Sequence, residues 1–230
     1  MEKGWNRMAS QKVLLLGPKG QLGQDLIRYS PSEYEILPFG RDQLDLRESE
    51  KIEAALLKRD WDILINTAAF VATEKAEEKP MEAYLVNSLA PREMAKACAK
   101  KGALFVQIST DFVFDGKKGT PYNEKDYPLP LNTYGITKLG GEFFAGSFAS
   151  NYYIIRTSSL YGKAGASGKG GNFPYSILRK AKKKEPLQVV DDIIMSPTYT
   201  GHLAKAIWEI VEKRPPLFII HLGGRGSASW

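Results

Sequence analysis

The chain is poor in cysteine and histidine and has no long hydrophobic run. Its one cysteine, Cys98, excludes an internal disulfide framework and is typical of a reducing compartment. Together with the two histidines, His202 and His221, it offers no metal-ligand spacing, so the sequence predicts no metal site. No apolar run approaches the roughly 20 residues that cross a bilayer. We therefore expect a cytoplasmic protein without a membrane partner.

The net charge of +6 favours anionic ligands, which include nucleic acid, phosphate-bearing cofactors and acidic substrates. The densest basic cluster is Arg-Lys-Ala-Lys-Lys-Lys at 179–184, within a predicted helix. We interpret it as a solvated helix end whose charge suits the negative end of the helix dipole. The sequence has no zinc pattern, RNP-like aromatic motif or basic heptad, which argues against a nucleic-acid partner.

Short apolar runs alternate along the chain with longer helical patterns. Strands are predicted at residues 12–16, 34–37, 63–66, 103–108, 152–156 and 217–221. Helices are predicted at 21–30, 49–59, 80–100, 133–149, 173–184 and 198–213. Several of the strands are apolar throughout, which indicates burial on both faces. This alternation predicts an α/β fold with a Rossmann-type, doubly wound parallel sheet built from right-handed βαβ units.

A glycine-rich loop follows the first predicted strand and opens a helix; it reads Gly17-Pro18-Lys19-Gly20-Gln21-Leu22-Gly23. In a dinucleotide-binding loop, Gly17 would permit the tight turn, Gly20 would let the backbone approach a pyrophosphate and Gly23 would let the helix pack on the strand. The helix N-terminus would supply N–H groups to the phosphates. The spacing is G-x-x-G-x-x-G, and a tight βα turn without a ligand is the alternative.

The end of the second predicted strand bears on the choice of cofactor. NAD sites usually place an acid there, on the ribose 2′-hydroxyl, but residues 37–41 read Leu-Pro-Phe-Gly-Arg. Arg41 would suit a 2′-phosphate, so the sequence favours NADPH, whereas the adjacent Asp42 keeps NADH as an alternative. Asp45 and Leu46 are placed to meet the adenine end. The other interpretation of Arg41 is a surface loop residue.

These features divide the chain into three parts. Residues 1–10 show no periodicity and are predicted to form an N-terminal tail, and residues 11–160 an NAD(P)-binding Rossmann domain. Residues 161–230 form a mixed segment that contributes a substrate lobe and late Rossmann elements. The chain ends in Ser229-Trp230 after a glycine-rich stretch, which resembles a helix start with no helix after it. We therefore expect the small C-terminal substrate lobe to be truncated.

Tyr134 and Lys138 lie four residues apart on a predicted helix and so share one face. A neighbouring ammonium lowers the pKa of a phenol, which would make Tyr134 a proton donor or acceptor near neutral pH. Ser109 and Thr110 end a buried strand, and ligands of such sheets gather at the carboxyl ends of strands. A hydroxyl there can hydrogen-bond a substrate carbonyl and stabilise its developing negative charge. Asp111 by itself would be an ordinary loop acid or an N-cap.

Several motifs occur together and in order along the chain. They are the glycine loop, Asn-Thr-Ala-Ala at 66–69, Ser-Thr-Asp at 109–111, Val-Phe-Asp-Gly at 113–116, Tyr134-x-x-x-Lys138 and Arg-Thr-Ser at 156–158. With this set the chain resembles the extended short-chain dehydrogenase/reductases, and within them the dTDP-4-dehydrorhamnose reductases, from about residue 12 to the last. Ser159 departs from that family, which usually has Trp at this position.

The resemblance implies an NADPH-dependent oxidoreductase that reduces the 4-keto group of a nucleotide-linked 6-deoxyhexose, with dTDP-L-rhamnose as product. It makes Thr110 and Tyr134 the catalytic hydroxyls, and Lys138 the residue that contacts the cofactor ribose and tunes the tyrosine. The implied cofactor contacts are Gly20, Gln21, Leu22, Asp45, Leu46, Ala69, Phe70 and Val71. The implied sugar contacts are Thr110, Asp111 and Ser159.

A second function stays open beside the reductase. A cofactor-binding regulatory subunit, similar to the β subunit of methionine adenosyltransferase, would share the fold. The retained Thr110, Tyr134 and Lys138 favour an enzyme, whereas the expected truncation favours a crippled or partial one. We expect a small nucleotide-sugar substrate as the partner, with a homodimer as the candidate assembly.

Overall fold

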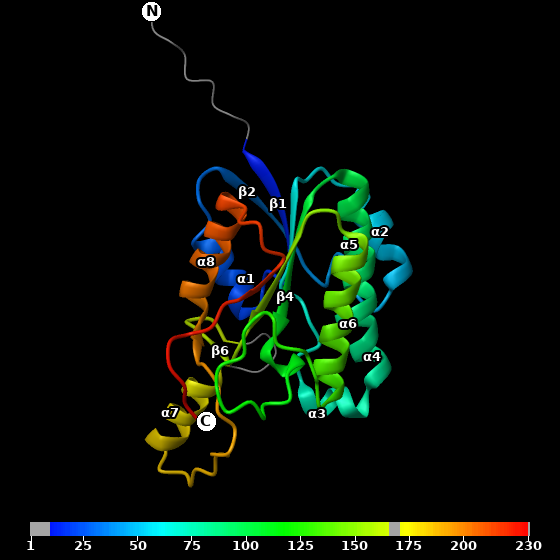
Figure 1. The fold of residues 1–230 in the computed structure, drawn as a ribbon. Helices are drawn as coiled ribbons and strands as arrows, with labels where there is room; N and C mark the ends of the chain where they lie inside the picture. The colour runs from blue at the N-terminus through cyan, green and yellow to red at the C-terminus, as the bar shows by residue number, and fades with distance from the viewer. Residues whose placement is uncertain (1–9, 166–170, 230) are drawn as a thin grey trace, which may run out of the picture.

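A six-stranded sheet forms the centre of the computed structural model, which describes residues 10–165 and 171–229. Its strands are β1 (Gln11–Leu16), β2 (Tyr34–Phe39), β3 (Ile63–Asn66), β4 (Leu104–Thr110), β5 (Tyr152–Thr157) and β8 (Ile219–His221). They lie in the order β2-β1-β3-β4-β5-β8, and every neighbouring pair is parallel (Figure 1). The predicted parallel sheet is confirmed. The predicted tail lies outside the described residues, except for Ser10.

Helices cover both faces of the sheet, which explains why its strands are apolar on both sides. The helices α1 (Gln21–Arg28) and α8 (Thr200–Lys213) lie on one face, and α2 (Ser49–Leu57), α5 (Ala90–Lys101) and α6 (Thr133–Phe148) lie on the other (Figure 1). In β1, Val13 and Leu15 pack on the α1/α8 side, while Leu14 and Leu16 pack on the opposite side. The doubly wound α/β arrangement is therefore confirmed.

The helix predicted at 80–100 is divided into three segments. These are α4 (Pro80–Tyr84), a π-helical turn η1 (Leu85–Leu89) and α5. Pro91 has no N–H to donate to the carbonyl of Asn87, so the α-helical ladder is interrupted there. The wider turn lets the Asn87 side chain donate to the Phe70 carbonyl and to the Thr137 hydroxyl, at 3.1 Å each. Turns of this kind occur frequently at functional sites. A short helix, α3 (Thr73–Glu78), precedes α4 where none was predicted.

The segment after β5 also differs from the prediction. The expected helix 198–213 begins only at Thr200, because Thr198–Tyr199 (β7) pair in parallel with Leu160–Tyr161 (β6). The helix α7 (Phe173–Lys182) lies between these two short strands in the sequence and projects from the lower end of the molecule in Figure 1. Within the described ranges, no helix is long and apolar enough to span a bilayer.

The order of the strands changes direction at β1. The chain passes from β1 to β2 on one side and then to β3 on the other side of β1. The carboxyl ends of β1 and β3 therefore open a crevice, and ligands of doubly wound sheets bind at such a point. The strand β4 extends two residues beyond its predicted end, so Ser109 and Thr110 belong to the strand and reach the same edge of the sheet.

Candidate active site

The turn after β1 needs glycine at two positions. Gly17 has a φ of 77°, and a Cβ there would lie 2.6 Å from the Thr67 hydroxyl oxygen and 2.8 Å from the Ala68 nitrogen. A Cβ on Gly23 would overlap the carbonyl oxygen of Gly17. The turn therefore holds α1 directly against the ends of β1 and β3, which brings the N-terminus of α1 to the crevice.

The N-terminus of α1 is suited to an anion. Gly20 is the N-cap, and no side chain of the described residues makes a capping hydrogen bond there, so the first N–H groups of α1 can turn to a ligand. The side-chain oxygen of Gln21 is buried and has no hydrogen-bond partner in the described part of the chain. Leu22 packs into the core, which leaves only its backbone for a ligand. This arrangement fits the diphosphate of a dinucleotide.

A pocket of about 220 Å³ lies beside the turn, at the ends of β1, β2 and β3. It is lined by Leu16, Gly17, Phe39, Gly40, Arg41, Leu44, Asp45, Leu46, Arg47, Ala68, Ala69, Phe70, Glu82 and Val86. The predicted cofactor residues Gly17, Arg41, Asp45, Leu46, Ala69 and Phe70 meet here. Val71, predicted with them, lies outside the lining and is 54% exposed. Apolar walls with a few charged groups fit an adenosine.

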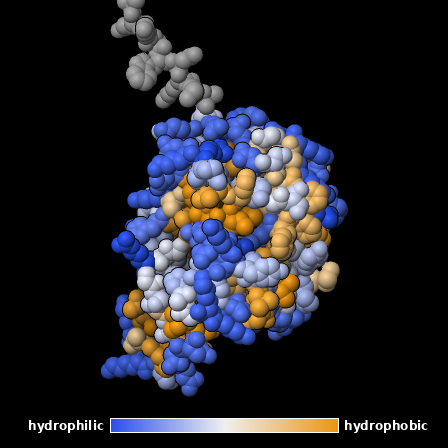
Figure 2. Space-filling view, viewed as in Figure 1, coloured by the Kyte–Doolittle hydropathy of each residue, from blue (hydrophilic) through white to orange (hydrophobic). Residues whose placement is uncertain are grey.

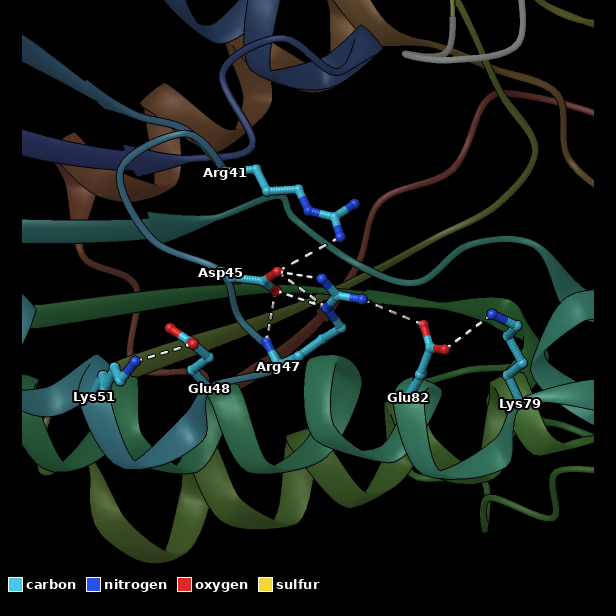
Figure 3. Close-up of polar contacts among 7 residues, drawn as sticks. All are labelled: Arg41, Asp45, Arg47, Glu48, Lys51, Lys79 and Glu82. Carbon is cyan, nitrogen blue, oxygen red and sulfur yellow. Dashed lines mark hydrogen bonds and ion pairs between the residues drawn. The ribbon is translucent and has the colours of Figure 1, made fainter.

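Two arginines face one carboxylate at this pocket (Figure 3). The Nε of Arg47 lies 3.0 Å from each oxygen of Asp45, whereas the nearest nitrogen of Arg41 lies 3.6 Å away. The hydrogen bonds from Arg47 lower the pKa of Asp45 to about 2, against a smaller effect of burial. Asp42, the acid that kept NADH as an alternative, forms an ion pair with Lys19 at 2.7 Å. Sequence reasoning missed Arg47, whose one signal is a basic residue two positions after Asp45.

The start of α6 is held against the turn that follows β4. The side chain of Asn132 caps the helix by accepting a hydrogen bond from the Gly135 N–H at 2.8 Å. A Cβ on Gly135 would overlap the carbonyl oxygen of Phe112, so only glycine permits this approach. Tyr134 and Lys138, which follow in the first two turns, are thereby brought to the carboxyl end of β4.

Thr110, Tyr134 and Lys138 lie together, but their electrostatics differ from the expectation. Burial raises the pKa of Tyr134 to about 12, and a hydrogen bond with Thr110 opposes this. Burial lowers the pKa of Lys138 to about 8, which Glu142 opposes. The prediction that the ammonium lowers the pKa of the phenol is therefore wrong. The Lys138 ammonium instead donates to the Ile108 carbonyl at 2.6 Å, and burial dominates the pKa of both groups.

The predicted sugar-binding residues separate into two places. Asp111 is half-buried beside β4, where it accepts a hydrogen bond from the Ser158 hydroxyl at 2.5 Å, and desolvation raises the pKa of its carboxyl. Ser159 has a φ of 39° in the left-handed region, and its hydroxyl donates to the sulfur of Met195. Ser158 thus lies beside Asp111. Sequence reasoning had not identified Ser158 as a site residue.

A buried ion pair lies next to Ser109, near the carboxyl end of β4. Arg156 on β5 donates to both oxygens of Glu142 on α6, at 2.6–3.1 Å, and both side chains are 4% exposed. Ser109 donates a short hydrogen bond to the same carboxylate. His221 on β8 lies 3.4 Å from the Arg156 guanidinium. This network ties α6 to three strands, and it could not be predicted because its members are far apart in sequence.

A second, larger cleft of about 1290 Å³ extends from Gln21 toward α7. Its lining includes four basic residues and two aromatic ones, Lys163, Arg179, Lys182, Lys183, Phe173 and Tyr175. Hydrophilic and hydrophobic atoms lie side by side over this end of the molecule (Figure 2). Part of the basic cluster therefore faces a cleft, whereas the sequence suggested only a solvated helix end. Among the described residues, no group of His, Cys, Asp or Glu side chains could hold a metal ion.

Comparisons with known proteins assign the family. The profile of the RmlD substrate binding domain matches residues 11–230. The dTDP-4-dehydrorhamnose reductase of Sinorhizobium fredii (strain NBRC 101917 / NGR234) is 35% identical over 225 residues, which cover 95% of this chain and 74% of that protein. The chain belongs to the RmlD substrate binding domain family.

Other RmlD-like relatives agree with this assignment. The spore coat polysaccharide biosynthesis protein SpsK of Bacillus subtilis (strain 168) is 34% identical over 95% of this chain and 75% of its own length. The crystal structure of dTDP-4-dehydrorhamnose reductase from Bacillus anthracis str. Ames in complex with NADP superposes with a TM-score of 0.88 at 35% identity, covering 96% of this chain and 77% of that one. The RmlD-family match confirms the resemblance to the extended short-chain dehydrogenase/reductases.

Proposed function

We propose that the protein reduces the 4-keto group of dTDP-4-dehydrorhamnose with NADPH and forms dTDP-L-rhamnose. One observation carries this proposal. The Tyr134 phenol and the Thr110 hydroxyl are hydrogen-bonded to each other at the carboxyl end of β4, on the same edge of the sheet as the glycine turn after β1. A carbonyl bound there would meet two hydroxyls beside a dinucleotide-type loop.

The tyrosine serves as the general acid in this proposal. With a pKa of about 12, Tyr134 is protonated at neutral pH and can donate to the carbonyl oxygen as negative charge develops on it. Thr110 orients the phenol and hydrogen-bonds the same oxygen. Bound NADPH would supply the hydride. The Lys138 ammonium, which donates to the Ile108 carbonyl, would also contact the ribose of the bound cofactor.

Binding of the cofactor would rest on residues of the first three strands and their loops. The N–H groups at the start of α1 would hold the diphosphate, and the pocket of about 220 Å³ would hold the adenosine. Arg41 lines that pocket and would pair with the 2′-phosphate. We expect Arg41→Gln to weaken NADPH binding about tenfold or more, while NADH binding changes little.

The larger cleft would hold the sugar nucleotide. Its volume of about 1290 Å³ exceeds that of the adenosine pocket several-fold, and Arg179, Lys182 and Lys183 would attract a diphosphate. Asp111 and Ser158 lie toward the catalytic hydroxyls, where they can hydrogen-bond hydroxyl groups of the sugar. These contacts would position the sugar so that its C4 carbonyl faces Tyr134.

The test is a direct turnover assay. The purified chain is incubated with dTDP-4-dehydrorhamnose and NADPH, the loss of nicotinamide absorbance is followed, and the sugar product is identified by mass. Tyr134→Phe serves as the chemically matched control, because it retains the aromatic ring and removes the phenolic hydroxyl that would donate the proton. We expect turnover by the parent and a strong loss in the variant. Tight NADPH binding without turnover on this substrate would contradict the proposal and favour a cofactor-binding regulatory subunit.

A further inference from the structure

The charged groups at the adenosine pocket form unequal pairs. Arg47 makes three side-chain contacts of 2.5–3.0 Å with Asp45, and its backbone N–H donates to the same carboxylate at 3.0 Å (Figure 3). Arg41 reaches that carboxylate only at 3.6 Å, and its side chain is 71% exposed. Asp45 is thus occupied by Arg47 rather than by Arg41.

The surrounding charges leave one cation in excess. The cluster in Figure 3 contains four basic residues and three acids, Arg41, Arg47, Lys51, Lys79, Asp45, Glu48 and Glu82. Lys51 pairs with Glu48 and Lys79 pairs with Glu82, at 3.0 Å in both cases. Since Arg47 makes the shorter contacts with Asp45, the cation in excess is Arg41, which keeps only the 3.6 Å ion pair with this carboxylate. That guanidinium lines the pocket and is largely exposed, so it can turn from Asp45 toward an anion.

We propose that Arg47 determines the preference for NADPH over NADH by acting through Asp45: it neutralises this carboxylate and leaves Arg41 available to the 2′-phosphate. Arg47 is in this sense a positioning residue rather than a phosphate ligand. The inference rests on the proposed use of NADPH and extends it to a residue that the sequence did not reveal.

Loss of Arg47 would change the pocket in a selective way. Asp45 stays ionised at neutral pH, so it would draw Arg41 toward itself and repel a 2′-phosphate. The ribose 2′-hydroxyl of NADH is uncharged and can donate a hydrogen bond to a free carboxylate. The same substitution should therefore weaken binding of NADPH and spare that of NADH.

The experiment measures binding of NADPH and NADH to the full chain by titration calorimetry. Arg47→Gln should lower the preference for NADPH about tenfold, chiefly through weaker NADPH binding. The double variant Asp45→Asn/Arg47→Gln should restore the preference, because Asn removes the charge but keeps the oxygen that accepts from the backbone N–H of residue 47. Lys51→Gln is the matched control: it removes a nearby charge that pairs with Glu48, outside the pocket lining, and should leave the preference unchanged.

Three results would overturn the inference. An unchanged preference in Arg47→Gln would show that Asp45 does not oppose the phosphate. Equal loss of NADPH and NADH would show that Arg47 only maintains the loop. A double variant that stays as weak for NADPH as Arg47→Gln would mean that Arg47 contacts the phosphate itself. Failure of the parent chain to bind either cofactor would instead refute the proposed function, and this inference with it.

Discussion

Replacement of Lys138 by methionine should stabilise the fold while abolishing the proposed reductase activity. Lys138 is 4% exposed, and burial lowers its pKa from 10.5 to about 8, which Glu142 opposes. A proton therefore binds this amine more weakly in the folded than in the unfolded chain. The protonated lysine costs stability at neutral pH, and methionine of similar length removes that cost.

The size of the gain follows from the two pKa values. A difference of about 2.5 pKa units at about 1.4 kcal/mol each corresponds to about 3 kcal/mol. Loss of the attraction to Glu142 offsets part of this, so we expect a gain of about 1–3 kcal/mol. No partner is left unpaired, because the Ile108 carbonyl still accepts from Gln107 at 2.8 Å and Glu142 still pairs with Arg156. The destabilisation by the protonated lysine is fully present below about pH 8 and disappears as the pH rises toward 10.5.

Urea unfolding of the parent and Lys138→Met, at pH 7 and at the highest pH the fold tolerates, measures this difference. The variant should be more stable at pH 7, and the gap should narrow as pH rises. Lys180→Met, at an exposed position of α7, is the matched control and should show no such pH dependence. Lower stability of Lys138→Met at pH 7, or a gain that does not change with pH, would refute the reasoning.

Three further predictions concern binding and catalysis. Tyr134→Phe should reduce kcat about 10²–10⁴-fold with NADPH affinity unchanged, since a general acid is lost; an unaltered kcat excludes Tyr134 as the acid. Gly17→Ala should weaken NADPH binding at least about tenfold in calorimetry, because the left-handed φ of 77° and the adjacent backbone leave no room for a Cβ; wild-type affinity would contradict the proposed loop. Arg179→Gln/Lys182→Gln should weaken binding of dTDP about tenfold and leave NADPH binding unchanged. Lys180→Gln, outside the cleft lining, should leave the binding of both ligands unchanged. Equal effects of the two variants on dTDP binding would show that the basic cluster is only a solvated helix end.

The strands and the glycine turn were predictable because their signals are local. A run such as Val-Leu-Leu-Leu in β1 is apolar throughout, which is typical of a strand covered on both faces. Gly17 and Gly23 stand where a βα turn brings backbone against backbone. Pro91 is a local signal for the break of the helix at 80–100, but the contacts of Asn87 with Phe70 and Thr137, which lie 17 and 50 residues away, could not be read from any local pattern.

The candidate site was likewise predictable only in part. The sequence gives the hydroxyls, the ammonium and the carboxylates that the site can use. The helical period predicts that Tyr134 and Lys138 share one face of a helix. The protonation of these groups does not follow from the sequence, because it depends on burial by residues from other elements. The position of Lys138 on the same helix face predicted a lowered pKa for Tyr134, whereas burial raises this pKa in the structure.

Long-range contacts decided the rest of the site. The sequence by itself determined the order of the βαβ units and the chemical groups available at the ends of their strands. Only the tertiary structure placed Ser158 beside Asp111 and buried Glu142 between Ser109 and Arg156, and it turned part of the basic helix α7 to a cleft. The physical reason is that charge pairing and desolvation depend on distances through space, whereas sequence patterns report only distances along the chain.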